Sequence, residues 1–129
     1  MERTLTLSPD PIRETDLIAS AVPSTRLGAV IRFSGVVRGE EDGAPIAGID
    51  YEAFVPMVDR QFGLLFDEME KLWPQVGSVR LVHRLGFVAA GEASLWVEVA
   101  APHRGEAFAA CQWLIDRMKQ VVPIWKRVK

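Results

Sequence analysis

Basic and titratable side chains at four places in this sequence could handle an anionic substrate. They are Arg38 after a strand-like segment, His103-Arg104 before a helix-like segment, Lys119 late in that segment, and Lys126 beyond a proline. Guanidinium, imidazole and ammonium groups bind phosphates and carboxylates. A partly desolvated lysine can also act as an acid, a base or a nucleophile. These residue types make an anion site able to move protons one hypothesis, beside a structural interpretation of each residue.

The His103-Arg104 pair lies at the junction between a predicted strand and the predicted helix that follows it. Helix N-termini present free amide hydrogens and the positive end of the helix dipole. An arginine there can bind a phosphate through two parallel hydrogen bonds. The alternative is an exposed helix start that carries an incidental basic pair, and the spacing leaves both interpretations open.

Lys119 and Lys126 each have a functional and a structural interpretation. At 100° per residue, Lys119 lies about 80° from Cys111 and so borders the apolar stripe of its helix. Its stem can follow apolar surface while its amine reaches a cleft, or it is an ordinary surface lysine. Lys126 lies in an extended PIWKRV segment, where Trp125 and Arg127 should point the opposite way. The alternative there is a solvated charge on a terminal strand.

Two other reactive residues are interpreted as structural. Cys111 lies in the middle of an apolar stripe, which favours a small buried hydrophobe and a poor sulfur donor or nucleophile. His83 alternates with Val79, Leu81 and Leu85 on an apolar strand face and is expected to be structural. The sequence has only two histidines, with no acid at a ligand spacing from either, so no metal site is expected.

Length and composition limit the possible classes of protein. The chain has 129 residues, which suits one domain over residues 1–129. A net charge of −2 argues against a general nucleic-acid binder. One cysteine excludes an intrachain disulfide. Because the first ten residues lack the apolar run of a signal peptide and no segment could span a membrane, we expect a cytoplasmic protein without membrane contact.

Strands are predicted at 4–7, 29–37, 49–54, 78–85 and 93–100, and helices at 11–21, 56–73 and 104–122. We expect strand 49–54 to return antiparallel to strand 29–37, residues 39–48 to form a loop, and residues 124–128 to be extended. Strands and two main helices in mixed order indicate an α+β fold with a mixed or antiparallel sheet. The two long helices carry apolar stripes: Val58, Phe62, Leu65, Phe66, Met69, Leu72 and Trp73 in one, and Ala107, Phe108, Cys111, Leu114, Ile115, Met118 and Val122 in the other.

Four blocks of residues carry a resemblance to a known family. They are GAVIRFSGVVRG, IDYEAFVPM, LVHRLG and APHRGEAFAACQWLIDRMKQVVPIWKR, and they extend from about Gly28 to Arg127. In order and spacing the sequence resembles the large, catalytic subunit of molybdopterin synthase. The most specific part is the combination of His-Arg at a helix start, a later lysine, and Pro-x-Trp-Lys-Arg.

The resemblance implies an α/β hammerhead-type fold and a homodimer within a heterotetramer. A small ubiquitin-like sulfur carrier would bind at each end and insert its C-terminal Gly-Gly as a thiocarboxylate. The implied activity is a sulfurtransferase reaction of molybdenum cofactor biosynthesis that converts cyclic pyranopterin monophosphate into molybdopterin. No cofactor is needed, because the carrier supplies the sulfur. Lys119 matches the catalytic lysine and Lys126 a second active-site lysine, whereas Arg38, His103 and Arg104 match residues of the anion pocket.

Helix geometry adds a constraint on this site. Sixteen residues separate His103 from Lys119, which places them about 24 Å apart along one helix. If both serve one pocket, that pocket must be shared across a twofold interface. The resemblance also implies a C-terminal tail with a further basic residue, and this sequence stops at Lys129. The alternative function is therefore a non-catalytic, dimeric anion- or pterin-binding homologue.

Overall fold

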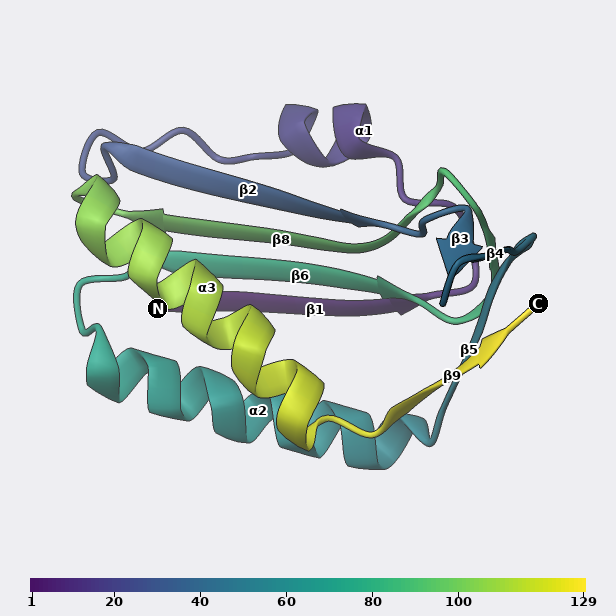
Figure 1. Cartoon of the computed structure of the whole chain (residues 1–129). Coiled ribbons are helices and arrows are strands. Elements are labelled where there is room, and N and C mark those ends of the chain that lie inside the picture. The colour runs from purple at the N-terminus through teal and green to yellow at the C-terminus, as the bar shows by residue number, and fades with distance from the viewer.

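A four-stranded mixed sheet forms the centre of the molecule. In the computed structural model, which describes residues 1–129, its strand order is β1-β6-β8-β2 (Figure 1). The strands are β1 (Glu2–Ser8), β6 (Ser78–Arg84), β8 (Ala93–Ala101) and β2 (Ala29–Val36). β1 runs parallel to β6, whereas β8 is antiparallel to both β6 and β2. The predicted α+β class with a mixed sheet is confirmed.

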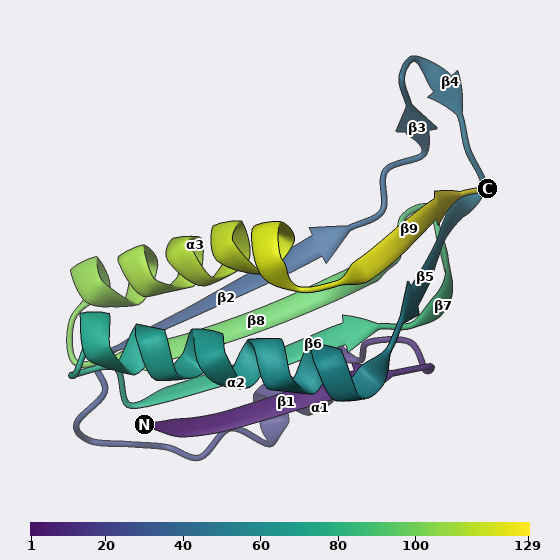
Figure 2. The ribbon, with the colours of Figure 1, turned by 90° about the horizontal axis from the view of Figure 1, so that it is seen from below.

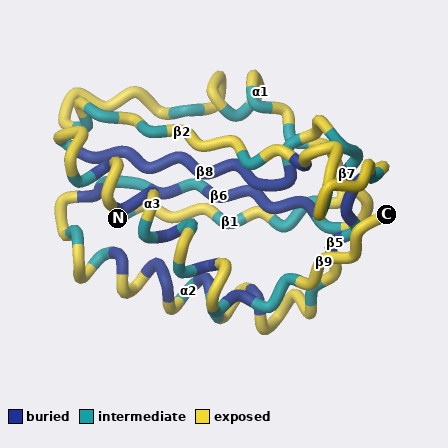
Figure 3. The backbone as a smooth tube through the Cα atoms, viewed as in Figure 1, coloured by how far each residue is buried: buried dark blue, intermediate teal, exposed yellow.

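Two long helices cover one face of this sheet. α2 (Val55–Leu72) and α3 (Arg104–Val121) lie on the same side, and the short α1 (Glu14–Ala19) lies on the other (Figures 1 and 2). Between helices and sheet lies a core of 18 buried residues, including Phe62, Leu81 and Leu114. β6 and β8, in the middle of the sheet, are the most continuously buried strands (Figure 3). The two main helices are confirmed, while α1 is shorter than the predicted 11–21.

The predicted apolar stripes are mostly buried, but two of their residues are exposed. Val58, Phe62, Leu65, Phe66 and Met69 of α2 are all buried. On α3 the buried residues are Ala107, Ala110, Cys111, Leu114 and Met118. Phe108 was predicted to belong to this stripe but is 58% exposed, because it is turned 100° from Ala107 around the helix and away from the sheet. Leu72, the last residue of α2, is also exposed.

A second, three-stranded sheet forms at one end of the molecule. β5 (Gly48–Ala53) lies between β7 (Gly86–Ala89) and β9 (Ile124–Val128), antiparallel to both. The expectation that strand 49–54 pairs with strand 29–37 is therefore wrong, since β2 pairs only with β8. A register shift between Gly35 and Val36 ends that pairing, and the chain then leaves the first sheet.

The segment expected to be a loop contains a small hairpin. β3 (Glu40–Glu41) pairs with β4 (Ala44–Pro45) around Asp42-Gly43. Both turn residues have positive φ, 51° for Asp42 and 80° for Gly43, as a two-residue hairpin turn of type I′ requires. The prediction of a plain loop over 39–48 is corrected accordingly, and the hairpin projects beyond the body of the molecule (Figure 2).

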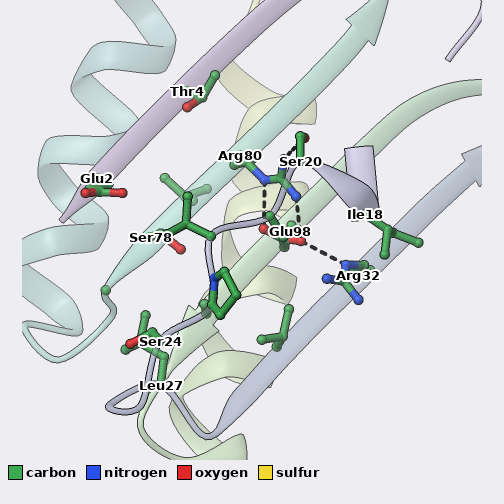
Figure 4. A pocket seen from close by; sticks show the side chains of 17 residues that line it. Glu2, Thr4, Ile18, Ser20, Ser24, Leu27, Arg32, Ser78, Arg80 and Glu98 are labelled. Atoms are coloured by element: carbon green, nitrogen blue, oxygen red, sulfur yellow. Dashed lines mark hydrogen bonds and ion pairs between the residues drawn. The ribbon is translucent and has the colours of Figure 1, made fainter. Parts of the chain in front are cut away.

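On the sheet face away from α2 and α3, a buried carboxylate joins two strands through arginines. Glu98 of β8 is 5% exposed and accepts hydrogen bonds from Arg32 Nε at 2.8 Å and from Arg80 Nε at 2.8 Å (Figure 4). Arg80 also donates to the Ser20 hydroxyl and to the Leu17 carbonyl, which fastens the α1 segment to the sheet. Glu98 is thus the centre of a structural ion-pair network.

Replacement of Glu98 by Gln should lower the free energy of unfolding by about 1–3 kcal/mol, because hydrogen bonds from two charged partners are weakened. Burial raises the pKa of Glu98, but the hydrogen bonds from Arg80 and Arg32 outweigh it and leave the pKa below its ordinary value of 4.5. The unfolded chain therefore takes up this proton first as pH falls. The advantage of wild type over Glu98→Gln should shrink below about pH 4.5.

Urea denaturation at pH 7 and at pH 3.5 measures both effects. The matched control is Glu52→Gln, which removes a 3.9 Å pair with Arg127 between two exposed side chains. It should change stability by less than about 0.5 kcal/mol. Equal effects of the two substitutions at pH 7 would contradict a structural role for the Glu98 network.

Candidate active site

Two of the predicted site residues, Lys119 and Lys126, line one small pocket. Its volume is about 160 Å³, and it lies where the C-terminal end of α3 meets β5 and β9. The other residues that line it are Tyr51, His83, Met118, Val122 and Ile124. The structure thus joins two lysines that are separated in sequence by the end of α3 and by Pro123.

The path of the chain after α3 explains this juxtaposition. α3 ends at Val121, and the chain then runs as β9 antiparallel to β5, with Lys126 opposite Tyr51. Because side chains alternate along a strand, Ile124 and Lys126 share the pocket side. Trp125 is 57% exposed and does not line the pocket. The predicted opposite orientation of Trp125 and Lys126 is confirmed.

The positive charge of this pocket, which we call the lysine pocket, is not neutralised. No carboxylate lines it, and neither lysine takes part in any of the ion pairs of the chain. Both lysines are exposed residues, so their amines are accessible to an incoming group, while Met118, Val122 and Tyr51 give the pocket a buried apolar wall. An anion that enters would meet two cations beside a surface of low dielectric, where charge interactions are strong.

His83 is a member of the pocket that the sequence interpretation missed. It is buried, its Nδ1 lies 2.6 Å from the Arg84 carbonyl oxygen, and its ring meets Tyr51 edge to face at 5.1 Å. Burial lowers the pKa of His83, the bond to the Arg84 carbonyl raises it, and the charge of Lys126 lowers it, so the net shift is downward. Alternation alone indicated only a buried histidine, since it cannot show which cavity borders the end of a strand.

Arg38, His103 and Arg104 do not line the lysine pocket. Arg38 is exposed and follows β2 at the same end of the molecule, next to Val37, which packs in a small core with Tyr51. His103 and Arg104 are exposed at the opposite end of α3 (Figure 1). There the His103 backbone N–H donates to Glu106 Oε1 at 3.2 Å, which places a carboxylate beside the start of α3. A single chain therefore assembles only the lysines.

A larger hollow of about 1000 Å³ lies under α1 on the opposite sheet face (Figure 4). None of the predicted site residues lines it. Its arginines are held by Glu98, so it offers little free positive charge.

The structure contains no cluster of three or more His, Cys, Asp or Glu residues that could hold a metal ion. No helix is long and apolar enough to cross a membrane.

Cys111 is buried on α3, as predicted, and its burial raises the pKa of the thiol to about 11. A thiol with this pKa is almost fully protonated at neutral pH, and the thiolate is the nucleophilic form. Cys111 does not line the lysine pocket. The chain therefore has no cysteine placed to donate or carry sulfur.

Comparison with known proteins agrees with this fold. Residues 7–121 match the family described as MoaE protein. A molybdopterin synthase catalytic subunit from Nostoc sp. is 37% identical over 123 residues, which are 95% of this chain and 73% of that protein. The crystal structure of molybdopterin synthase from Staphylococcus aureus superposes with a TM-score of 0.85 at 29% identity, covering 98% of this chain and 89% of that chain.

A complex of subunits 1 and 2 of the molybdopterin-converting factor from Helicobacter pylori has the same fold. Its TM-score is 0.75 at 23% identity, with 98% of this chain and 83% of that chain covered. The α+β fold of this chain is thus shared with proteins named as molybdopterin synthase subunits. The chain belongs to the MoaE family.

Proposed function

We propose that this chain is the catalytic subunit of a molybdopterin synthase, a sulfurtransferase of molybdenum cofactor biosynthesis. The substrate is cyclic pyranopterin monophosphate, and the sulfur comes from the thiocarboxylate of a carrier protein. The observation that carries this proposal is the lysine pocket, which Lys119 and Lys126 line without any neutralising carboxylate. The reaction requires no resident cofactor, because the carrier brings the sulfur.

The size of the lysine pocket suggests which reactant enters it. Pockets that enclose a small molecule usually have volumes of about 300–1,000 Å³. The lysine pocket, at about 160 Å³, can hold only the tip of a ligand. A Gly-Gly thiocarboxylate is narrow, extended and negatively charged, so it fits both the volume and the charge. The phosphorylated pterin then lies at the mouth of the pocket, next to the sulfur.

The lysines have distinct roles in this proposal. The thiocarboxylate sulfur forms a bond to an oxygen-bearing carbon of the pterin precursor, the C–O bond at that carbon breaks, and the departing oxygen takes up a proton. Attack of water on the thioester carbonyl then breaks the carbon–sulfur bond to the carrier. Sulfur stays on the pterin, and the carrier leaves as a carboxylate. Lys119 engages the carrier terminus or the substrate and moves protons in these steps. Lys126 stabilises developing negative charge by its position.

The proposed partner is a small ubiquitin-like carrier subunit with a C-terminal Gly-Gly. The Helicobacter pylori protein of the same fold forms a complex of two different subunits, which supports such a partner. Two copies of this chain and two carriers would form a heterotetramer in the cytoplasm. The carrier's tail would enter the lysine pocket from the end of the molecule at which β9 lies.

A second copy of this chain would complete the site. His103 and Arg104 lie too far along α3 to share a small substrate with Lys119 of the same protomer. β2 is an edge strand of its sheet, and exposed Phe33 of β2 and Phe108 of α3 leave apolar surface on two elements that pack together. We propose that a twofold partner covers this surface with its own α3 antiparallel. His103, Arg104 and Arg38 would then hold the pterin phosphate.

Reconstitution with thiocarboxylated carrier and pterin precursor tests the proposed function. Wild type should form molybdopterin, and Cys111→Ala should do so at a rate within about twofold of wild type, because a protonated, buried thiol cannot take part in the transfer. Molybdopterin is quantified by chromatography with fluorescence detection after oxidation. Carrier binding without any product would instead favour the alternative, a non-catalytic dimeric anion- or pterin-binding homologue.

A further inference from the structure

The tautomer of His83 follows from its hydrogen bond. Nδ1 lies 2.6 Å from the Arg84 carbonyl oxygen, and a carbonyl oxygen can only accept a hydrogen bond. Nδ1 therefore carries the proton in this contact. In a neutral imidazole the other nitrogen, Nε2, then has a free lone pair and acts as an acceptor.

Nε2 of His83 has no partner within the chain, yet it is not sealed in the interior. The hydrogen bond of this side chain is made by Nδ1, and the only buried, unpartnered side-chain nitrogens that are closed to solvent belong to Arg84. His83 lines the lysine pocket, and with Nδ1 bound to the backbone only Nε2 is left to offer a lone pair there. A lone pair thus faces a pocket whose other polar groups are two ammonium groups and the Tyr51 hydroxyl.

We infer that His83 is a positioning residue of the lysine pocket: its Nε2, unpartnered in this structure, is the acceptor that holds the Lys126 ammonium when the pocket is occupied. This inference rests on the proposed function and assigns that site a further residue. Lys126 lies on β9 opposite Tyr51, Tyr51 packs edge to face on the His83 ring, and all three residues line the lysine pocket. That hydrogen bond would hold an otherwise exposed side chain in one rotamer and would point its positive charge into the pocket.

The same geometry makes the arrangement sensitive to pH. The groups that face the ring are Lys126 from β9, Lys119 from α3 and Tyr51 from β5, and none of them is acidic at neutral pH. Protonation of Nε2 removes the acceptor and adds a third positive charge. Burial and the charge of Lys126 oppose this protonation, and the net pKa of His83 lies below its ordinary value of 6.5. The acceptor is therefore present at neutral pH and is lost only on acidification.

Two amide substitutions separate the pocket role of His83 from its structural role. His83→Asn keeps a donor for the Arg84 carbonyl but leaves nothing at the Nε2 position. His83→Gln places an amide oxygen near the Nε2 position but gives up the bond to Arg84. Single-turnover sulfur transfer is measured for both variants from pH 5 to 8, together with their melting temperatures.

We expect His83→Asn to be slower than wild type by about tenfold to a hundredfold, the factor that one hydrogen bond to a charged group supports. His83→Gln should retain the faster transfer of the two although it melts at the lower temperature, and its activity should lack the acid-side loss that His83 causes in wild type. If activity instead follows melting temperature, with His83→Asn the faster, or if both variants match wild type, the inference is overturned.

A second measurement does not depend on activity. In wild type, ring ¹⁵N shifts of His83 should report the Nδ1–H tautomer at pH 7.5, and the pKa of His83 should rise in Lys126→Gln. Lys71→Gln, at an exposed lysine in the last turn of α2, should leave this pKa unchanged. A His83 titration that is insensitive to Lys126→Gln would refute the contact even if molybdopterin forms. Absence of product from wild type would refute the proposed function while the titration still decides the inference.

Discussion

Lys119→Ala should lower the rate of sulfur transfer by about 10²–10⁴-fold, the usual cost of losing a positioned proton-transfer group. The substitution removes one of the two unneutralised amines of the lysine pocket and leaves the buried wall intact, because Lys119 itself is exposed. The measurement is single-turnover molybdopterin formation with saturating thiocarboxylated carrier. The carrier must be saturating because the loss of rate in Lys119→Ala should appear in the chemical step and not only in the affinity for the carrier.

Lys71→Ala is the matched control for this substitution. Lys71 is an exposed lysine in the last turn of α2, as Lys119 is in the last turn of α3, but it lies outside the pocket. The Lys71→Ala protein should transfer sulfur at the wild-type rate. Both variants should keep the wild-type melting temperature within a few degrees. A Lys119→Ala protein that is folded, binds carrier and retains more than about a tenth of the activity would contradict the assigned role.

Dimers that combine two differently substituted protomers should recover activity that neither parent homodimer has. Homodimers of Lys119→Ala and of His103→Ala should both be nearly inactive, and dimers that combine one protomer of each should recover about half of the wild-type activity. In a twofold dimer with shared sites, one site of the mixed dimer receives both substitutions and the other receives neither. Co-expression with two different affinity tags and sequential purification isolates the mixed species for the same single-turnover assay.

The lysine pocket itself supplies the control for this experiment. Lys119 and Lys126 line one pocket of a single protomer, so a mixed dimer of Lys119→Ala and Lys126→Ala has a damaged pocket at both sites. No recovery is expected for that pair. Recovery in the control, or a mixed dimer with His103→Ala as inactive as its parents, would mean that the sites are not shared across the interface.

The helices and the character of single strands follow from local patterns in the sequence. Periodic apolar residues predicted α2 and α3 and the burial of Phe62 and Cys111, because helix periodicity decides which side faces a sheet. Alternation in PIWKRV correctly separated Trp125 from Lys126. Residue types made Lys119 and Lys126 candidates for anion chemistry, and the resemblance to the family assigned both to one active site.

Pairing between distant segments could not be obtained in the same way. The partners of β5 depend on a bulge between Gly35 and Val36 and on the return of β9 after Pro123, and neither changes the local pattern of β5 itself. The exposure of Phe108 depends on how α3 is rotated on the sheet. Each of these is set by contacts between elements far apart in the chain, whose free energies the local sequence does not report.

The role of His83 shows most clearly which features the local sequence determines and which only the folded structure determines. Its place on an apolar strand face is a local property and was predicted, but its neighbours are Tyr51 from another sheet and two lysines from the C-terminal end of the chain. Local periodicity therefore accounts for the burial of the ring and for the charge types available. Only the folded arrangement brings the ring and the amines to one cavity, because proximity between residues 51, 83, 119 and 126 is created by the packing of the second sheet against the end of α3.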